Sequence, residues 1–252
     1  MVEQAKATGQ GSPDDPAVQA VADRALALVF DGAKLGLGTG RAASAFITKL
    51  AARVREGLRV VGVPTSEASA AQARELGIPL VELDEDTVLD MTVDGADEVA
   101  PNLDLVKGWG GALVRERIVA AASQRQVILA GAEKLVRNLG ERGRIPVEVI
   151  PIARGLVTRR LKELGVTVTL RNGSDGRPFV TDNSNLTLHC RLDAPLADGA
   201  AARALEARIL DIAGVVDTGL FLGTAERVLI GHPDGRVDEL MRESRGTRGA
   251  AP

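Results

Sequence analysis

The chain has 252 residues, of which 45% are hydrophobic and 26% are charged, and its formal net charge is -3. This composition is ordinary for a globular protein, and the small negative charge offers no basic surface for nucleic acid or an anionic membrane. Aromatic residues are only 2%, with one Trp and no Tyr, so platforms for stacking bases are not expected. The composition therefore argues against nucleic acid and membrane as partners.

The single cysteine, Cys190, cannot form an internal disulfide, which is expected of a protein in a reducing compartment. It lies in the apolar segment NLTLHC, where a small buried side chain is a simpler role than a nucleophile. No signal segment is evident, and no window approaches the roughly 20 apolar residues of a membrane span, so we expect a cytoplasmic protein. Residues 1–14 and 242–252 are polar and rich in small residues, which predicts disordered ends.

Helix and strand patterns alternate in the first half of the chain. Asp15 and Pro16 are typical of a helix start, and apolar residues at helical spacing then predict a helix up to Phe30. Further helices are predicted at 41–57, 66–77 and 111–124, and strands at 33–38, 58–64, 88–97 and 126–134, the last running into a loop. The alternation predicts an α/β fold, a Rossmann-like parallel sheet with helices on both faces.

The pattern changes near Gly140. Strand, helix, strand, strand, helix and strand are predicted at 146–151, 153–165, 166–171, 185–192, 199–214 and 215–221. This βαββαβ order is the split arrangement of a ferredoxin-like module. A last strand at 226–232 is expected to return to the first sheet, because a lone strand must pair somewhere. The sequence thus predicts a Rossmann-like catalytic domain of residues 1–140 and 222–252, with an inserted α+β domain of residues 141–221.

A glycine-rich turn, GLGTG at 36–40, joins a predicted strand to a predicted helix. Backbone N–H groups at such a helix start suit a phosphate. The glycines lack the spacing of a dinucleotide-binding motif, and the Gly-Lys-Ser/Thr of a P-loop is absent. Glycines here would equally serve close packing of the strand and helix, so the residues alone leave both interpretations open.

Asp94 and Asp97 follow a predicted strand, and Lys107 precedes a second glycine-rich turn. The strand delivers both acids to the carboxyl edge of the sheet, where open α/β sheets bind ligands. Two nearby carboxylates repel each other, so at least one needs a raised pKa or a cationic neighbour such as Lys107. A solvated loop is the alternative interpretation.

Glu116 and Lys134 are ambiguous from the pattern alone. Glu116 lies between Arg115 and Arg117 in an amphipathic run, which is typical of a helix surface. Lys134 follows a strand end, where a lysine usually faces solvent. The chain's two histidines have no partner at a ligand spacing and no Cys/His cluster occurs, so the sequence predicts no metal site and no cofactor.

Taken together, these segments resemble the type A family of ribose-5-phosphate isomerases. The stretch DGADEVAPNLDLVKGWGGALVRERIVA is similar to the family's central signature. Further matching segments, in the family's order, are GLGTG, VPTSEASAAQARELGI, IPVEVIPIA, TDNSNL and GVVDTGLFLGTAERVLIG. The similarity runs from about residue 17 to residue 235, and several motifs in one order are more specific than any single motif.

The resemblance implies an isomerase of the pentose phosphate pathway that interconverts ribose 5-phosphate and ribulose 5-phosphate through an enediolate, without metal. Glu116 is then the general base that carries a proton between C2 and C1, which overturns the surface interpretation. Asp94 and Lys107 help to open the sugar ring and stabilise the oxyanion, and Asp97 positions hydroxyls. The resemblance also implies a homodimer or homotetramer.

The predicted substrate-binding residues come from four segments of the chain, and they include both positions that match the family and positions that depart from it. These residues are Thr39, Gly40, Arg41, Ala42, Asp97, Gly108, Trp109, Gly110 and Lys134. Within this set, Lys134 and the Thr39-Gly40 turn hold the phosphate.

Three positions depart from the family pattern. Arg41 and Ala42 stand where the family usually has Ser-Thr, and Val18 lies near the position of a family lysine. We expect the Arg41 guanidinium to supply the missing phosphate contacts, the alternative being that it faces solvent or another subunit. Trp109 stands where glycine is usual, and its side chain either walls the sugar pocket or packs on the neighbouring domain.

Two other functions occur on related folds. A non-catalytic sugar-phosphate sensor would need a DNA-binding module, and too few residues precede the first predicted helix for a helix-turn-helix. An amino-sugar-phosphate deaminase or a lactonase generally uses a catalytic histidine, and neither histidine here lies in a glycine-rich loop at a strand end. The isomerase is therefore the predicted function.

Overall fold

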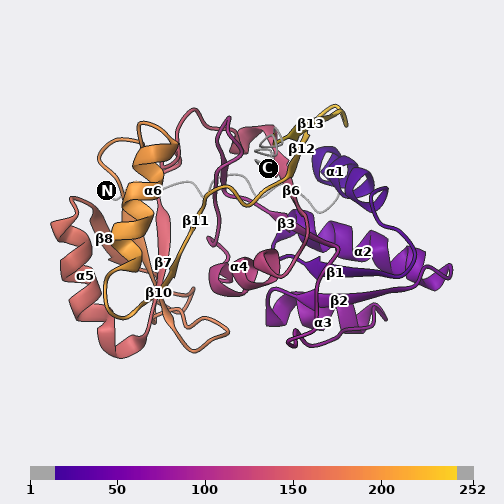
Figure 1. The fold of residues 1–252 in the computed structure, drawn as a ribbon, viewed down its shortest axis with the longest axis horizontal. Helices are drawn as coiled ribbons and strands as arrows, with labels where there is room; N and C mark the ends of the chain where they lie inside the picture. Colours follow the sequence, from indigo (N-terminus) through magenta and orange to yellow (C-terminus); the bar gives the residue numbers. More distant parts are fainter. Residues whose placement is uncertain (1–14, 243–252) are drawn as a thin grey trace, which may run out of the picture.

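The computed structural model describes residues 15–242, and its largest element is a six-stranded sheet in the order β13-β12-β6-β3-β1-β2 (Figure 1). All neighbouring strands are parallel except the edge pair β12–β13. The strands are β1 (Ala33–Leu37), β2 (Val60–Pro64), β3 (Met91–Gly95), β6 (Gln126–Gly131), β12 (Arg227–Gly231) and β13 (Val237–Met241). The predicted parallel sheet is confirmed, and so is the return of the last predicted strand to it, as β12.

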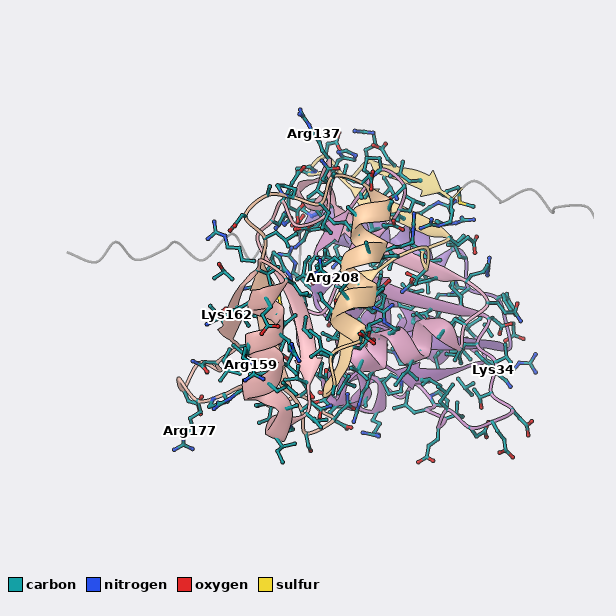
Figure 2. The ribbon with its side chains drawn as sticks, turned by 60° about the vertical axis from the view of Figure 1, so that its left-hand side comes forward. Lys34, Arg137, Arg159, Lys162, Arg177 and Arg208 are labelled. Atoms are coloured by element: carbon teal, nitrogen blue, oxygen red, sulfur yellow. The ribbon has the colours of Figure 1, made fainter. Side chains whose placement is uncertain are left out.

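A second, four-stranded sheet has the order β10-β7-β9-β8 with antiparallel neighbours throughout. Its strands and helices follow one another as β7 (Ile145–Val149), α5 (Arg154–Glu163), β8 (Thr167–Leu170), β9 (Leu186–Arg191), α6 (Gly199–Leu210) and β10 (Val215–Thr218). The predicted βαββαβ order is therefore confirmed, while the domain limits at 140/141 and 221/222 stay a prediction. Both helices cover one sheet face, and their outward Arg159, Lys162 and Arg208 extend from the surface (Figure 2).

A third, three-stranded sheet was not predicted. It consists of β4 (Glu98–Val99), β5 (Leu105–Val106) and β11 (Leu220–Phe221) in the order β11-β5-β4. The single strand predicted at 215–221 is wrong, because the chain divides at Gly219 and β10 and β11 belong to different sheets. The Gly219 N–H donates to the Pro146 carbonyl at 2.7 Å, and its carbonyl accepts from the Lys107 N–H at 2.9 Å. A side chain at Gly219 would lie 2.4 Å from the Lys107 carbonyl, so this crossing needs glycine.

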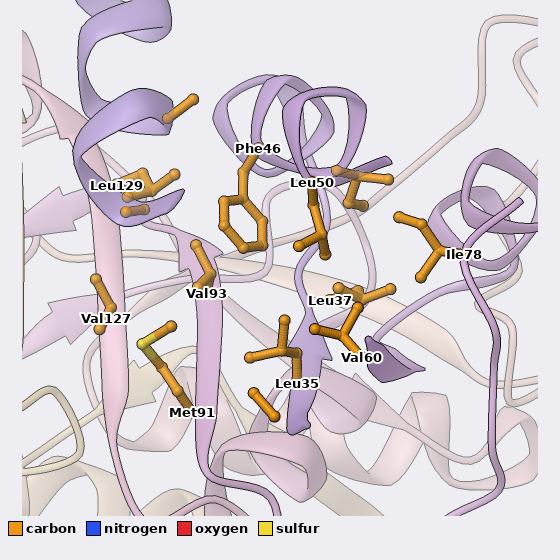
Figure 3. Close-up of a cluster of buried hydrophobic side chains, with 14 of the residues drawn as sticks. Leu35, Leu37, Phe46, Leu50, Val60, Ile78, Met91, Val93, Val127 and Leu129 are labelled. Carbon is orange, nitrogen blue, oxygen red and sulfur yellow. The ribbon is translucent and has the colours of Figure 1, made fainter. Parts of the chain in front are cut away.

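Side chains alternate across the strands of the six-stranded sheet, so each face has its own core. Helices α1 (Pro16–Leu26) and α2 (Arg41–Arg55) cover one face, where Phe46 and Leu50 pack among Leu35, Leu37 and other aliphatic side chains (Figure 3). The first helix thus ends earlier than the predicted Phe30. A third helix, α3 (Glu67–Glu75), adds Ala73 to the same cluster.

Helix α4 (Leu113–Ala121) covers the opposite face of the six-stranded sheet. Its Val119 packs with Val63 and Leu89, and its Leu113 packs with Ile128. The helix lies between the two larger sheets and contacts both β3 and β10 (Figure 1). The predicted helices on both faces of the sheet are therefore confirmed. Helix α4 differs from α1 and α2 because it also packs against the four-stranded sheet.

Strand β13 was not predicted, and the assignment of Arg242 to a disordered tail is wrong. Arg242 donates from Nε to the Ala225 carbonyl at 2.8 Å and from Nη2 to the Leu103 carbonyl at 2.9 Å. The rest of the predicted disorder, at 1–14 and 243–252, lies outside the described residues. Within residues 15–242, no helix combines the length and apolar character needed to cross a membrane.

Substitution of Gly36 should loosen the contact between β1 and α4. A Cβ at Gly36 would lie 2.2 Å from Thr92 Oγ1 and 2.6 Å from Val119 Cγ1. We expect Gly36→Ala to lower the free energy of unfolding by about 1–3 kcal/mol through overpacking, measured by urea denaturation.

The matched control is Gly155→Ala in helix α5, where a Cβ would meet nothing within 4 Å. This variant should gain about 0.5–1 kcal/mol, because alanine favours a helix over glycine. Equal unfolding free energies for the two variants would contradict the packing account.

Candidate active site

The ends of β1 and β3 bring the first glycine turn against Asp94. Asp94 Oδ1 accepts the Thr39 N–H at 3.0 Å and the Gly95 N–H at 2.8 Å. A Cβ at Gly38 would lie 2.3 Å from this Oδ1 and 2.5 Å from the Asp94 Cα. Glycine at position 38 thus serves close packing, as one sequence interpretation had it, and this packing also orients a buried acid.

Lys107 follows β5 and places its ammonium beside two carboxylates. Its Nζ lies 2.9 Å from Asp94 Oδ2, 2.6 Å from the Gly95 carbonyl and 3.3 Å from Glu116 Oε2. The side chains of Lys107 and Asp94 are 2% and 0% exposed. Burial alone would lower the pKa of Lys107, but Asp94 and Glu116 raise it above the ordinary lysine value. The ammonium therefore stays charged, and the solvated-loop interpretation of Asp94 and Lys107 is wrong.

Glu116 lies in the first turn of α4 and is buried, so the surface interpretation from periodicity is wrong. Among the described residues, no donor makes a well-directed hydrogen bond to its buried Oε2. Burial raises the pKa of Glu116, and Asp94 and Asp97 raise it further, while Lys107 opposes them. The result is a carboxyl group that takes up a proton more readily than an ordinary glutamate.

The arginines that flank Glu116 bind neighbouring elements instead of solvent. Arg115 donates from Nε to Asn183 Oδ1 at 3.0 Å, in the loop before β9. Arg117 donates from Nη2 to the Thr218 carbonyl at 2.7 Å and to the Leu220 carbonyl at 2.8 Å. The Arg-Glu-Arg run therefore fixes α4 against the second and third sheets, with Glu116 directed inward.

Asp97 is held by the second glycine turn. Its Oδ2 accepts the Trp109 N–H at 2.9 Å. Burial raises the pKa of Asp97, although this N–H and the nearby Lys107 lower it. The turn adopts positive φ at Gly108 (91°) and Gly111 (96°), not at Trp109, so the bulky residue occupies a position that does not require glycine.

The Trp109 side chain turns toward the four-stranded sheet. Its Nε1 donates to the Arg144 carbonyl at 3.0 Å, and the Arg144 guanidinium lies 4.2 Å from the indole centroid. The indole also packs against the hydrophobic cluster of β7, β9, α5 and α6. This placement corresponds to packing on the neighbouring domain, the second of the two sequence alternatives.

The turn at Thr39 and Gly40 contacts two residues that sequence reasoning missed. Thr39 Oγ1 lies 2.7 Å from Thr65 Oγ1 and 2.7 Å from Ser66 Oγ. The sequence did offer a signal for Thr65 and Ser66, because these two hydroxyl residues directly follow the strand predicted at 58–64. Gly40, with φ of 100°, caps α2. A hollow of about 200 Å³ lies here, lined by Gly38, Thr39, Gly40, Arg41, Ser44, Ala68, Ser69 and Gln72.

Lys134 lies in the 3-10 helix η1 (Ala132–Lys134) that follows β6, half-buried rather than fully in solvent. Burial lowers its pKa, and the charges of Arg142 and Arg41 lower it further. Arg41 begins α2 and Ala42 follows it, so the charge at the start of this helix is felt at Lys134. Within residues 15–242 no three or more His, Cys, Asp or Glu side chains group as a metal ion would require.

The structure thus unites Asp94, Lys107 and Glu116 in direct contact and joins Thr39 to Asp94. It places Asp97 against the turn formed by Gly108, Trp109 and Gly110, where its Oδ2 accepts the Trp109 N–H and its own N–H donates to the Val106 carbonyl at 2.8 Å, next to Lys107. The charge of Asp97 raises the pKa of both Lys107 and Glu116.

Comparison with known proteins gives a consistent result. The family model of ribose 5-phosphate isomerase A (phosphoriboisomerase A) matches residues 61–235. Ribose-5-phosphate isomerase A of Roseiflexus sp. (strain RS-1) is 50% identical over 222 residues, which are 87% of this chain and 94% of that protein. The Deinococcus radiodurans protein of the same name is 47% identical over 221 residues, 87% of this chain and 95% of its own.

Solved structures agree with these relatives. Ribose 5-phosphate isomerase A from Methanocaldococcus jannaschii superposes with a TM-score of 0.84 at 41% identity, covering 91% of this chain and all of that chain (100%). A D-ribose-5-phosphate isomerase in complex with phospho-erythronic acid gives 0.83 at 34% identity, covering 89% and 97%. The chain therefore belongs to the ribose 5-phosphate isomerase A family and interconverts ribose 5-phosphate and ribulose 5-phosphate.

Proposed function

We propose that Glu116 is the general base of this isomerase and that Lys107 and Asp94 form its oxyanion partner and ring-opening pair. The observation that carries the proposal is the burial of Glu116 Oε2, which lies 3.3 Å from the Lys107 ammonium and accepts no well-directed hydrogen bond among the described residues. A buried carboxylate oxygen whose hydrogen bonding is incomplete is costly for stability. A general base explains this cost, because the oxygen must be able to accept a proton from the substrate.

The proton-transfer step follows from this arrangement. Glu116 removes the proton from C2 of the open-chain aldose, the electron pair forms the C1–C2 double bond, and the C1 oxygen becomes negative. The Lys107 ammonium stabilises that charge in a water-poor site. Glu116 then returns the proton to C1, and the proton of the C2 hydroxyl passes to the C1 oxygen, giving the C2 carbonyl and the C1 hydroxyl of the ketose.

Asp94 and Asp97 have separate roles in the proposal. Asp94 accepts from Thr39, Gly95 and Lys107 at once, so it holds the ammonium in place and is near enough to assist ring opening. Asp97, fixed by the Trp109 N–H, positions sugar hydroxyls. A carboxylate that is already oriented loses little further entropy when it binds a hydroxyl.

The phosphate is proposed to bind where α2 begins. Backbone N–H groups at a helix start favour an anion, Thr39 supplies a hydroxyl, and Arg41 and Lys134 supply charge. A relative at 34% identity was solved with phospho-erythronic acid, a sugar acid phosphate. That complex supports the same class of ligand here, with Arg41 taking over from the family's Ser-Thr pair.

Two further expectations from the sequence remain proposals. A homodimer or homotetramer is supported by the family resemblance and by exposed apolar side chains at Ile150 and Ile152, the latter 93% exposed. A cytoplasmic location is supported by the free, buried Cys190. Burial raises the pKa of that thiol to about 12, which suits a packing role rather than a nucleophile.

Replacement of Glu116 by glutamine tests the base. Glu116→Gln keeps the size of the side chain but cannot accept the proton, so kcat should fall on the order of 10²–10⁴-fold or more. The measurement is ribulose 5-phosphate formation with a chelator present. Glu75→Gln, an exposed change in α3, should leave kcat unchanged, and a Glu116→Gln enzyme within tenfold of wild type would refute the assignment.

The raised pKa of Glu116 predicts where activity is lost in acid. The base must be ionised, so kcat/KM should fall as the pH drops through the pKa of Glu116, above the ordinary glutamate value of about 4.3. The substrate phosphate also titrates at about pH 6, so kinetics alone do not separate the ionisation of Glu116 from that of the substrate. Carboxyl-carbon NMR of enzyme labelled only in glutamate, assigned with Glu116→Gln, would do so, and a Glu116 titration at the ordinary value would contradict the prediction.

Replacement of Arg41 tests the phosphate site. If the guanidinium holds the phosphate in ground state and transition state alike, Arg41→Ala should raise KM for ribose 5-phosphate more than it lowers kcat. Arg55→Ala, an exposed change in the last turn of the same helix, should alter neither constant. An unchanged KM for Arg41→Ala would leave Arg41 without a role in binding.

A further inference from the structure

Arg171 connects the four-stranded sheet to the backbone of the active-site turn. Arg171 comes directly after β8, and its Nη2 donates to the Gly110 carbonyl at 3.1 Å. The guanidinium also stacks on Phe179, 3.6 Å from the ring centroid. The backbones of both residues are fixed, since the Arg171 N–H donates to the Thr187 carbonyl and the Phe179 N–H donates to the Arg171 carbonyl.

The fit between this pair and the turn depends on glycine. Gly111 has φ of 96°, and a Cβ there would lie 2.4 Å from Arg171 Nη1 and 2.4 Å from the Phe179 ring. The pair therefore occupies the space directly over Gly111. Nη1 is buried without a hydrogen-bond partner among the described residues, and Nη2 donates to a backbone carbonyl. Packing and the bond to Gly110, rather than a carboxylate, hold the guanidinium.

The turn that Arg171 contacts carries the hydrogen bond to Asp97. Gly110 follows Trp109, whose N–H donates to Asp97 Oδ2 at 2.9 Å, and it leads through Gly111 into the helix of Glu116. We propose that Arg171, stacked on Phe179, is a positioning residue that holds Gly110 so that the Trp109 N–H stays on Asp97. Its effect on the reaction rests on the role proposed above for Asp97.

A purely electrostatic role is the competing explanation. Burial lowers the pKa of Arg171, as does the nearby Arg144, while Asp97 raises it, so the positive charge of Arg171 is felt at Asp97. The two explanations predict different activities for Arg171→Lys, which retains the charge but loses the planar stacking on Phe179 and the guanidinium N–H that reaches Gly110. They differ again for Phe179→Leu, which removes the stack and leaves the charge.

Trp109 makes the position of the turn directly measurable. It is the only tryptophan and the chain has no tyrosine, so intrinsic fluorescence reports this turn alone. The experiment compares Arg171→Lys, Arg171→Ala and Phe179→Leu with wild type, using Trp109 emission, its quenching by acrylamide, and kcat/KM for ribose 5-phosphate. The control is Arg177→Ala, whose side chain extends from the outer end of the same loop into solvent (Figure 2).

All three test variants should shift Trp109 emission and increase its quenching, and should lower kcat/KM by about 10- to 100-fold, since a displacement of about 1 Å can cost this much. The control, Arg177→Ala, should match wild type in Trp109 fluorescence and in kcat/KM. Full activity in Arg171→Lys would overturn the proposal in favour of charge alone. Lost activity without a change at Trp109 would also overturn it. A change at Trp109 without lost activity would overturn it where Asp97→Asn itself loses activity.

If Arg171→Ala fails to fold, Arg171→Lys and Phe179→Leu decide between these outcomes. The proposed function is tested separately by Asp97→Asn. If that variant retains full activity, the role of Asp97 is wrong, and Trp109 fluorescence in the Arg171 variants still shows whether Arg171 holds the turn.

Discussion

The ammonium of Lys107 is the constraint on which the rest of this site depends. A buried charge is tolerated only where paired and hydrogen-bonded groups replace its water. Here the replacements come from the end of β3, through Asp94 and the Gly95 carbonyl, and from α4, through Glu116. The charge therefore ties the six-stranded sheet to α4, and the proposed stabilisation of an oxyanion uses the same attraction.

The close approaches that glycine permits make this arrangement possible. Gly38 lets the turn after β1 approach Asp94 closely enough for the Thr39 N–H to donate to Asp94 Oδ1. Gly219 lets the chain cross from the second sheet to the third beside Lys107. The small third sheet then fixes the Lys107 backbone through β5 and the Gly219 carbonyl. A side chain at either glycine would displace the Lys107 ammonium or its acceptors. The same two glycines are therefore needed both for the packing of the backbone and for the geometry of the site.

The spacing of apolar residues was sufficient to predict the long helices and strands, but it was insufficient to predict the residues of the site. The parallel sheet and the βαββαβ order follow from apolar patterns that span whole strands and helices. Strands of two residues such as β4, β5 and β11 carry no period, so the third sheet was missed. Glu116 was misjudged because its burial is set by Arg115 and Arg117, whose partners at Asn183 and Thr218 lie far along the chain. Only the resemblance to a family favoured an inward-facing Glu116, and its role as the base stays a proposal.

Trp109 shows why a departure from a family pattern need not disturb the chemistry. Of the turn's residues, Gly108 and Gly111 have the conformation that favours glycine, and position 109 contributes its backbone N–H to Asp97. Any residue except proline supplies that donor. The indole is then free to pack on the second sheet's cluster and bond the Arg144 carbonyl. The substitution therefore leaves the donor in place and adds contacts between the turn and the four-stranded sheet, the same two parts that Arg171 joins.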